Sequence, residues 1–179
     1  MSIKITTGLA RLSYAHLFTA HTNFEGQEPK FSAQIIIPKS DTKTLKAIND
    51  ALAQLLSEAY PNNKKIPANY HTPLKDGDLL EGRPEVVGCY FLNASAKDRP
   101  GVVDADVQPI LDKSEVYSGC FCRFNISLYA YNTSVNKGLG CGLNHVQKIK
   151  DGPSLEGKGS ADQAFSDGYK LGTDEEAGF

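Results

Sequence analysis

Residues 117–131 read YSGCFCRFNISLYAY, and their character alternates with a period of two. One set of alternate positions is apolar and consists of Cys120, Cys122, Phe124, Ile126, Leu128 and Ala130. The other set carries rings and polar groups and consists of Phe121, Arg123, Asn125, Ser127, Tyr129 and Tyr131. Because successive side chains of a strand point to opposite faces, the stretch predicts one long strand with a core face and a decorated face.

The decorated face combines three aromatic rings, one guanidinium group and two small polar groups. This chemistry suits a surface on which bases stack and phosphates are neutralised. A second interpretation is that tyrosine and phenylalanine simply favour strands and sit half-buried under another layer. The strand by itself leaves both interpretations open.

The rest of the chain predicts a mainly β protein with one helix. Further strands are expected at residues 3–14 (with a bend at Gly8), 30–37, 86–96 and 137–150, with short apolar pieces at 102–103 and 107–111. The strand at 137–150 has glycine at every second position from 138 to 142, so backbone or ligand can approach it closely. A helix is expected from about residue 41 to 60, because Ser40 or Asp41 can cap a run of leucines at helical spacing that stops at Pro61.

These elements favour an OB-fold-like five-stranded barrel with one inserted helix, because that barrel combines few strands with an open, ligand-binding face. The barrel would occupy residues 1–150 as one domain. Residues 62–85 are rich in Pro, Asn, Gly and Lys and are expected to form a long loop. Residues 151–179 are dominated by small and acidic residues, and we expect them to form a flexible tail.

Composition limits the setting in which the chain acts. No apolar run approaches the roughly 18 residues needed to span a bilayer, and the N-terminal residues contain no signal-peptide core. We therefore expect no membrane partner and a cytoplasmic location. The four cysteines fall in strand-like apolar runs and lack the spacing of zinc ligands, which predicts core thiols, no metal, no disulfide and no cofactor.

The net charge of −2 conceals an uneven distribution. Residues 1–150 hold 17 of the 19 basic residues and 14 of the 21 acidic ones, a balance of +3. Residues 151–179 carry a balance of −5. The total charge by itself argues against a nucleic-acid partner, but a mildly basic body with an acidic tail is compatible with such a partner.

The most specific local signature is the segment GLGCGLNHVQKIKDG at residues 138–152, preceded by Tyr117-Ser118-Gly119. Together they resemble a family of tailed-phage proteins first catalogued as a domain of unknown function, and the order of elements is similar across residues 1–155. The resemblance implies an OB-fold protein that coats single-stranded DNA during phage replication or recombination. The pattern departs from the family at His145, where a second asparagine is expected.

The last residues resemble the ends of bacterial and phage single-stranded DNA-binding proteins, in which several acids precede a final phenylalanine. The matching residues here are Asp174, Glu175, Glu176 and Phe179. A terminal ring with its own carboxylate can enter an apolar pocket ringed by Arg or Lys, while the acids steer the encounter. The resemblance implies that this tail binds replication or recombination proteins.

Two other classes of protein compete with this interpretation. Asp104, Asp106 and Glu115 could form a Mg²⁺ site of a nuclease, but no Lys or His lies at a spacing that would supply a base. No Walker-type loop or catalytic triad is present in the sequence. The other class is a phage structural or assembly protein built on a β-barrel, which would not need the decorated strand or the acidic tail.

The sequence therefore predicts a non-enzymatic, sequence-independent single-stranded DNA-binding protein, as a monomer or a homodimer. The residues expected to stack on bases are Phe121, Tyr129 and Tyr131, with Tyr90 or Phe91 according to the register of that strand. The residues expected to contact phosphates are Arg123, Lys97 and Arg99, with Lys64 and Lys65 from the long loop.

Overall fold

The computed structural model describes residues 2–22, 24–61, 66, 68, 70–132, 137–155 and 168. The strands are β1 (Ser2–Thr6), β2 (Ala10–His21), β3 (Lys30–Pro38), β4 (Lys75–Asp76), β5 (Cys89–Ala96), β6 (Gly101–Val103), β7 (Phe121–Asn132) and β8 (Lys137–Lys150). The helical elements are α1 (Thr42–Ala59) and the short 3-10 turns η2 (Gly77–Leu79), η3 (Pro84–Val86) and η4 (Lys113–Glu115). The predicted mainly β class with one α-helix is confirmed.

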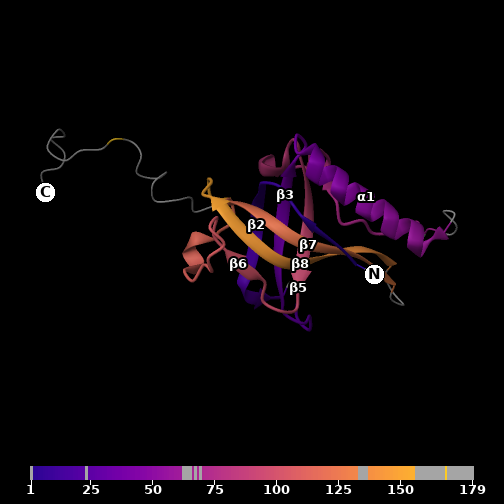
Figure 1. Ribbon diagram of the computed structural model, residues 1–179, viewed down its shortest axis with the longest axis horizontal. Coiled ribbons are helices and arrows are strands. Elements are labelled where there is room, and N and C mark those ends of the chain that lie inside the picture. The colour runs from indigo at the N-terminus through magenta and orange to yellow at the C-terminus, as the bar shows by residue number, and fades with distance from the viewer. Residues whose placement is uncertain are drawn as a thin grey trace, which may run out of the picture.

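Five of the strands close into a barrel (Figure 1). Hydrogen-bonded pairs run from β7 to β2, β3, β5, β8 and back to β7. These pairs are antiparallel except β5–β8, which is parallel and places Ser95 opposite Gly142. The fold is thus an OB-fold-like five-stranded barrel, as predicted, with β1 added beside β7 and β6 beside β8.

The alternation that predicted β7 is present in the barrel. Cys120, Cys122, Phe124, Ile126 and Leu128 are all 0% exposed and lie in the main core. The side chains at the intervening positions are half-buried or exposed. Ala130 is exposed, so the core face ends one position earlier than the pattern indicated.

The first predicted strand is divided in two, but both parts run along the same partner. β1 pairs with the middle of β7 and β2 pairs with its start, so the chain follows β7 through the break at residues 7–9. Gly8 allows the break to pack against α1: its N–H donates to Thr44 Oγ1 at 2.9 Å, and a Cβ there would lie 2.7 Å from Asp41 Oδ2. The expected bend at Gly8 is therefore real, and it contacts the helix.

Helix α1 begins and ends as predicted. The Asp41 carboxylate accepts the N–H of Thr44, which caps the first turn. The buried face carries Leu45, Ile48 and Leu52 into the same core as the inward side chains of β7. In Figure 1 the helix lies outside the ring of strands at the upper right.

Two expected boundaries are wrong for local reasons. β5 begins at Cys89 rather than 86, because residues 84–86 form η3 instead. β2 continues to His21, where the mixed polar sequence concealed the strand. Of the two short apolar pieces, 102–103 lies in β6, whereas 107–111 forms no strand because Val107 has φ 63° and lies in a turn closed by Asp104.

The body extends slightly past residue 150. Gly152 and the Tyr117 hydroxyl share a hydrogen bond of 2.8 Å, and Arg11 Nη2 donates to the Pro153 carbonyl at 2.6 Å. The Leu155 N–H donates to the Ser118 carbonyl, and its side chain packs near Val86. Residues 151–155 therefore lie against the barrel rather than in the tail.

The cysteines are core thiols, as expected. Cys120, Cys122 and Cys141 are buried and Cys89 is half-buried, and all four are free. The sulfur atoms of Cys120 and Cys122 lie 3.6 Å apart on the core face of β7.

Candidate nucleic-acid interface

Two cavities on the outer surface of the barrel share Asn93 and Ser95 of β5 and form one depression, here called the sheet groove. The first, of about 530 Å³, is lined from β2, β3 and β5 and includes Tyr14, His16, His21 and Lys30. The second, of about 340 Å³, is lined from β5, β7, β8 and the segment 71–75 and includes His71, Lys75, Tyr129 and Tyr131. The groove therefore crosses the face formed by the second and third barrel strands, which is where OB-folds bind oligonucleotides.

Small polar residues form the floor of the sheet groove. The strand register aligns Ser127 with Gly142, Gly142 with Ser95, and Ser95 with Ser32. The next neighbour across the sheet is His16 of β2. Because these side chains are short, the floor leaves room for a ligand to approach the backbone.

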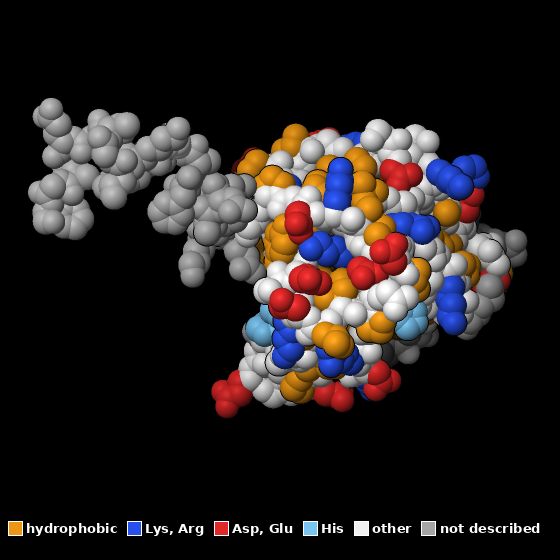
Figure 2. Space-filling model, turned by 60° about the vertical axis from the view of Figure 1, so that its left-hand side comes forward, with side chains coloured by type: hydrophobic (Ala, Val, Ile, Leu, Met, Phe, Trp, Pro, Cys, Tyr) orange, Lys and Arg blue, Asp and Glu red, His pale blue; other side chains and the backbone are white. Residues whose placement is uncertain are grey.

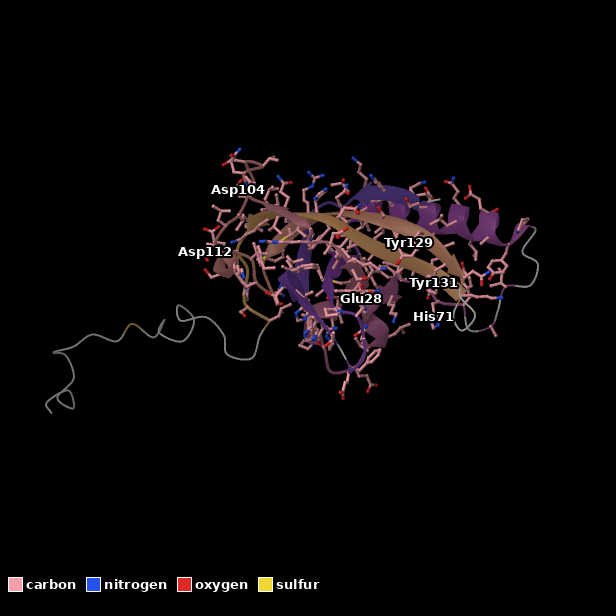
Figure 3. The ribbon with its side chains drawn as sticks, turned by 90° about the horizontal axis from the view of Figure 1, so that it is seen from below. Glu28, His71, Asp104, Asp112, Tyr129 and Tyr131 are labelled. Atoms are coloured by element: carbon pink, nitrogen blue, oxygen red, sulfur yellow. The ribbon has the colours of Figure 1, made fainter. Side chains whose placement is uncertain are left out.

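Tyr129 and Tyr131 stand at one end of the groove, next to His71 (Figure 3). Both rings lie against glycines of β8: a Cβ on Gly140 would be 2.6 Å from Tyr129 Cζ, and one on Gly138 would be 2.9 Å from the Tyr131 hydroxyl. Gly138 also allows the backbone at His71 to pair with β8. The alternate glycines thus permit the close approach that the sequence indicated. Burial raises the pKa of Tyr129, which remains a neutral phenol at pH 7.

Basic side chains flank the floor on both sides. Lys30 and Lys75 line the sheet groove itself. A third cavity of about 380 Å³, next to the groove along β5 and β8, is lined by Lys4, Lys97 and Arg99, with Asp98 among them. The structure therefore brings the predicted pair Lys97 and Arg99 together beside the groove, and adds Lys4 from the outer face of β1.

Phe121 and Arg123 lie apart from the tyrosines, near the start of β7. The Phe121 ring is covered by Gly152 and lies between Arg11, 5.7 Å from the ring centroid, and Lys150, at 5.1 Å. Arg123 Nε donates to the Thr7 carbonyl at 3.0 Å. Neither residue lines the cavities of the groove. Their expected contacts with DNA stay a prediction, and the geometry does not favour contacts with a strand that also binds Tyr129 and Tyr131.

Tyr90 and Phe91 need a correction, because neither offers a free ring to the groove. Tyr90 points to the core side of β5 and packs against the main core, with Lys39 Nζ 5.1 Å from its ring centroid. Phe91 is on the groove side of the strand but is only 6% exposed, in a cluster with Ile36 and Val86. The turn η3 covers this ring, and the sequence did not predict that turn.

β2 also contributes to the groove, which the sequence did not predict. His16 and His21 stack with centroids 4.1 Å apart and an interplanar angle of 4°. Burial, and then the neighbouring His21, lower the pKa of His16, so this imidazole is neutral at pH 7. Tyr14, His16 and His21 have no regular alternation because irregularities in pairing interrupt the strand after Ser13 and after His16. The signal available in the sequence was the excess of rings and imidazoles between residues 14 and 24.

Several predicted residues lie outside the described part of the chain. These are Lys64 and Lys65 of the long loop, and Asp174, Glu175, Glu176 and Phe179 of the tail. Their roles remain predictions.

Of the acidic residues considered for a nuclease site, Asp104 is engaged in turn formation. Asp104 Oδ1 accepts the N–H groups of Asp106 and Gln108 at 2.9 and 3.0 Å. Asp104 and Asp112 lie at the far end of the molecule from Tyr129, Tyr131 and His71 (Figure 3). Within the described ranges, no cluster of three or more His, Cys, Asp or Glu side chains is arranged to hold a metal ion.

Charge is mixed over the surface rather than gathered into one strongly basic field. On the face shown in Figure 2, Lys and Arg side chains alternate with Asp and Glu. Ion pairs account for part of this mixture, including Lys39 with Asp76 and Asp78 at 2.9 and 2.6 Å. Among the described residues, no helix has the length and apolar character needed to cross a membrane.

A closed five-stranded barrel with an aromatic and basic groove over its central strands defines an OB-fold protein of the oligonucleotide-binding type. A family model described as the ssDNA-binding protein of Enterobacter phage Enc34 matches residues 3–177. The chain belongs to this family. The resemblance to tailed-phage single-stranded DNA-binding proteins is thus confirmed, as is the expectation of a binding protein rather than an enzyme.

Known relatives agree with this assignment. Putative protein p50 of Acyrthosiphon pisum secondary endosymbiont phage 1 is 30% identical over 184 residues, covering 97% of this chain and 98% of p50. The C-terminal truncation of the bacteriophage Enc34 single-stranded DNA-binding protein has a TM-score of 0.71 and 27% identity, over 83% of this chain and 86% of that one. The structure of the bacteriophage Enc34 single-stranded DNA-binding protein in complex with ssDNA has a TM-score of 0.75 and 24% identity, over 86% of this chain and 89% of that one.

A more distant protein shares the fold alone. The single-stranded DNA-binding protein gp2.5 of bacteriophage T7 has a TM-score of 0.64 and 15% identity, over 96% of this chain and 97% of that one.

Proposed function

We propose that this protein binds single-stranded DNA along the sheet groove, without sequence preference, and coats it in the host cytoplasm during phage replication or recombination. The observation that carries the proposal is the placement of Tyr129 and Tyr131 beside Lys75 in a groove over the central barrel strands. Membership of the Enc34 ssDNA-binding family supports the same ligand.

The chemistry of the groove favours a single strand over a duplex. Tyrosine rings stack on bases only when the bases are unpaired and accessible, and every base has a face that can stack. The floor is built of short side chains such as Ser95, Ser32 and Ser127, with Asn93 beside them. Few of these groups are positioned to form hydrogen bonds that would distinguish one base from another. We therefore infer that DNA is bound through stacking of its bases and neutralisation of its phosphates, without sequence preference.

The dependence of binding on salt tests this proposal. Lys4, Lys30, Lys75, Lys97 and Arg99 line the groove and the adjoining cavity, so about three to five phosphates would be neutralised. At about −0.7 per phosphate, the slope of log K against log salt should be about −2 to −3.5. Gel shift or fluorescence anisotropy with a labelled oligo-dT measures it. Affinity that is indifferent to salt would contradict the electrostatic part of the proposal.

The same titration distinguishes the alternative functions. A shift without cleavage in the presence of Mg²⁺ is expected for a coating protein. Mg²⁺-dependent cleavage would indicate a nuclease. No binding even at low salt would leave the structural or assembly protein as the better interpretation.

We further propose that the acidic tail recruits replication or recombination proteins and competes with DNA for the groove. After Leu155 the chain holds six acidic residues and two lysines. The chain reaches Leu155 beside a cavity of about 360 Å³ that Tyr14 and His16 also line, so the tail starts at the edge of the groove. A charged segment tethered at this point is present at high local concentration.

Removing residues 156–179 should therefore strengthen DNA binding. We expect a gain of about tenfold at low salt, because exposed charge pairs contribute about 0.2–1 kcal/mol each and several would be released. The gain should shrink at physiological salt, where screening is stronger. The cut leaves residues 151–155 in place because they pack on the barrel.

Deletion of Phe179 alone is the matched control for the truncation. It should leave the electrostatic competition almost unchanged and impair only the binding of a partner protein. Weaker DNA binding by the truncated protein than by the full chain would mean that the tail belongs to the DNA site.

A further inference from the structure

Tyr14 of β2 is presented to the groove in an unusual way. The residue is 58% exposed, and it lines both the larger cavity of the groove and the adjoining cavity near Leu155. The strand bulges here, because Tyr14 and Ala15 together face the single residue Ala33 of β3. Regular alternation after the buried Leu12 would have placed the Tyr14 side chain on the core face of β2. The bulge instead places it on the face that lines the groove.

The backbone of Tyr14 has φ 45°, in the left-handed region that bulky residues rarely adopt. Such conformations persist where surrounding structure holds them, and they cluster at functional sites. A merely structural tyrosine would gain little from this arrangement, because more than half of the residue is exposed to solvent.

One face of the ring is backed by a fixed cation. The Arg83 guanidinium carbon lies 4.8 Å from the ring centroid of Tyr14. Arg83 is held in place by Glu85 Oε1 at 2.6 Å and by Gln34 Oε1 at 2.7 Å. Gln34 donates in turn to Asn93 Oδ1 at 3.2 Å, on the floor of the groove. The Arg83–Glu85 pair is largely buried, with side-chain exposures of 17% and 19%.

We propose that Tyr14 is a second base-stacking platform, at the end of the sheet groove opposite Tyr129 and Tyr131. The inference rests on the proposed binding of single-stranded DNA. The ligand at this position is an unpaired nucleobase, stacked on the face of the ring that Arg83 leaves open. The guanidinium behind the ring fixes the orientation of the ring through the cation–π contact.

The spacing of the two platforms makes the inference specific. From β2 to β7 the groove crosses four strand spacings, or about 19 Å of sheet at about 4.8 Å each. That distance corresponds to about six bases stacked at about 3.4 Å, and to fewer in an extended strand. A very short oligonucleotide can therefore occupy only one platform, whereas a longer one occupies both.

Affinity measured at two oligonucleotide lengths tests this arrangement. For oligo-dT of about 16 nucleotides, which covers the site of one OB-fold, Tyr14→Asn should weaken binding about 5- to 150-fold, the loss of one stacked base. For oligo-dT of about 2 nucleotides, which cannot span the groove even when extended, the loss should be much smaller, because Tyr129 and Tyr131 can hold it alone. Tyr14→Phe keeps the ring and should retain the affinity at both lengths.

Thermal stability distinguishes a binding role from a structural one. Asparagine tolerates the left-handed conformation, so Tyr14→Asn should leave Tm unchanged or raise it. A fall in both Tm and affinity would assign Tyr14 a structural role and overturn the proposal.

A fluorescent probe gives an independent readout of stacking, because the chain has no tryptophan. Emission from the Tyr14→Trp protein should be quenched when the longer oligonucleotide binds. Leu111→Trp is the control, since Leu111 is 90% exposed and adjoins Asp112 at the end of the molecule remote from Tyr129 (Figure 3). If wild type binds the oligonucleotide while Tyr14→Asn binds equally well, this inference fails and the proposed function stands. If wild type does not bind, the proposed function itself fails.

Discussion

Replacing Tyr129 and Tyr131 by alanine should weaken binding to oligo-dT by about 1–3 kcal/mol for each base that loses its stacking partner. The double replacement should therefore have the largest effect on binding of any change in the groove, although neighbouring rings need not add independently. The effect on Tm should be small, because Tyr129 is 37% exposed and rests on Gly140 rather than in the core. Anisotropy titrations and thermal melts of the same preparations measure both quantities.

Tyr129→Phe and Tyr131→Phe are the matched controls for these alanine variants. Each keeps the ring and removes only the hydroxyl, so affinity should remain close to that of wild type if stacking is the interaction. A loss as large as that of the alanine variants would show that the hydroxyl groups bind DNA instead. Unchanged affinity of the double alanine variant would place the bases elsewhere on the protein.

Replacing Phe124 by alanine should destabilise the fold by about 3–5 kcal/mol, because the ring is 0% exposed and its removal leaves a cavity. This is a large share of the 5–15 kcal/mol that typically stabilises a domain. The protein that remains folded should bind oligo-dT with nearly unchanged affinity, since Phe124 points into the barrel while Tyr129 points out of it. Urea unfolding measures the free energy, and titration under folding conditions measures the binding.

Leu111→Ala provides the comparison for this stability measurement. Leu111 is 90% exposed, so its truncation should change the free energy of unfolding by no more than about 0.5 kcal/mol. If Tyr129→Ala unfolded the protein while Phe124→Ala remained stable, the two faces of β7 would have been assigned the wrong way round.

The long, regular elements could be predicted from the sequence because their signals are local. The alternation through β7 identified the buried side of the strand from Cys120 to Leu128 before any partner strand was known. The spacing of leucines and the cap at Asp41 likewise placed α1 within one residue at each end. Each signal arises because one face of a strand or helix is in the core and the other faces solvent.

The candidate site could be predicted only where it lies on regular strands. Tyr129 and Tyr131 were identified because they alternate with core residues, and Lys97 and Arg99 because they follow a strand in a polar turn. Tyr14 and the stacked pair His16 and His21 were missed, because bulges break the alternation in β2. Phe91 was misjudged because a segment close in sequence, η3, folds back over its ring.

The amino-acid sequence by itself determined the mainly β fold class, the core face of β7, the position of the helix and the contrast between a mildly basic body and an acidic tail. These properties depend on periodicity and composition, which are local features of the sequence. Only the tertiary structure decided which outward residues meet. Closing β2, β3, β5, β8 and β7 into a ring brings Tyr14 and Tyr129 to opposite ends of one groove, and it leaves Phe121 under Gly152. Such proximity depends on strand register and on bulges, which arise from pairing between segments that are distant in the sequence.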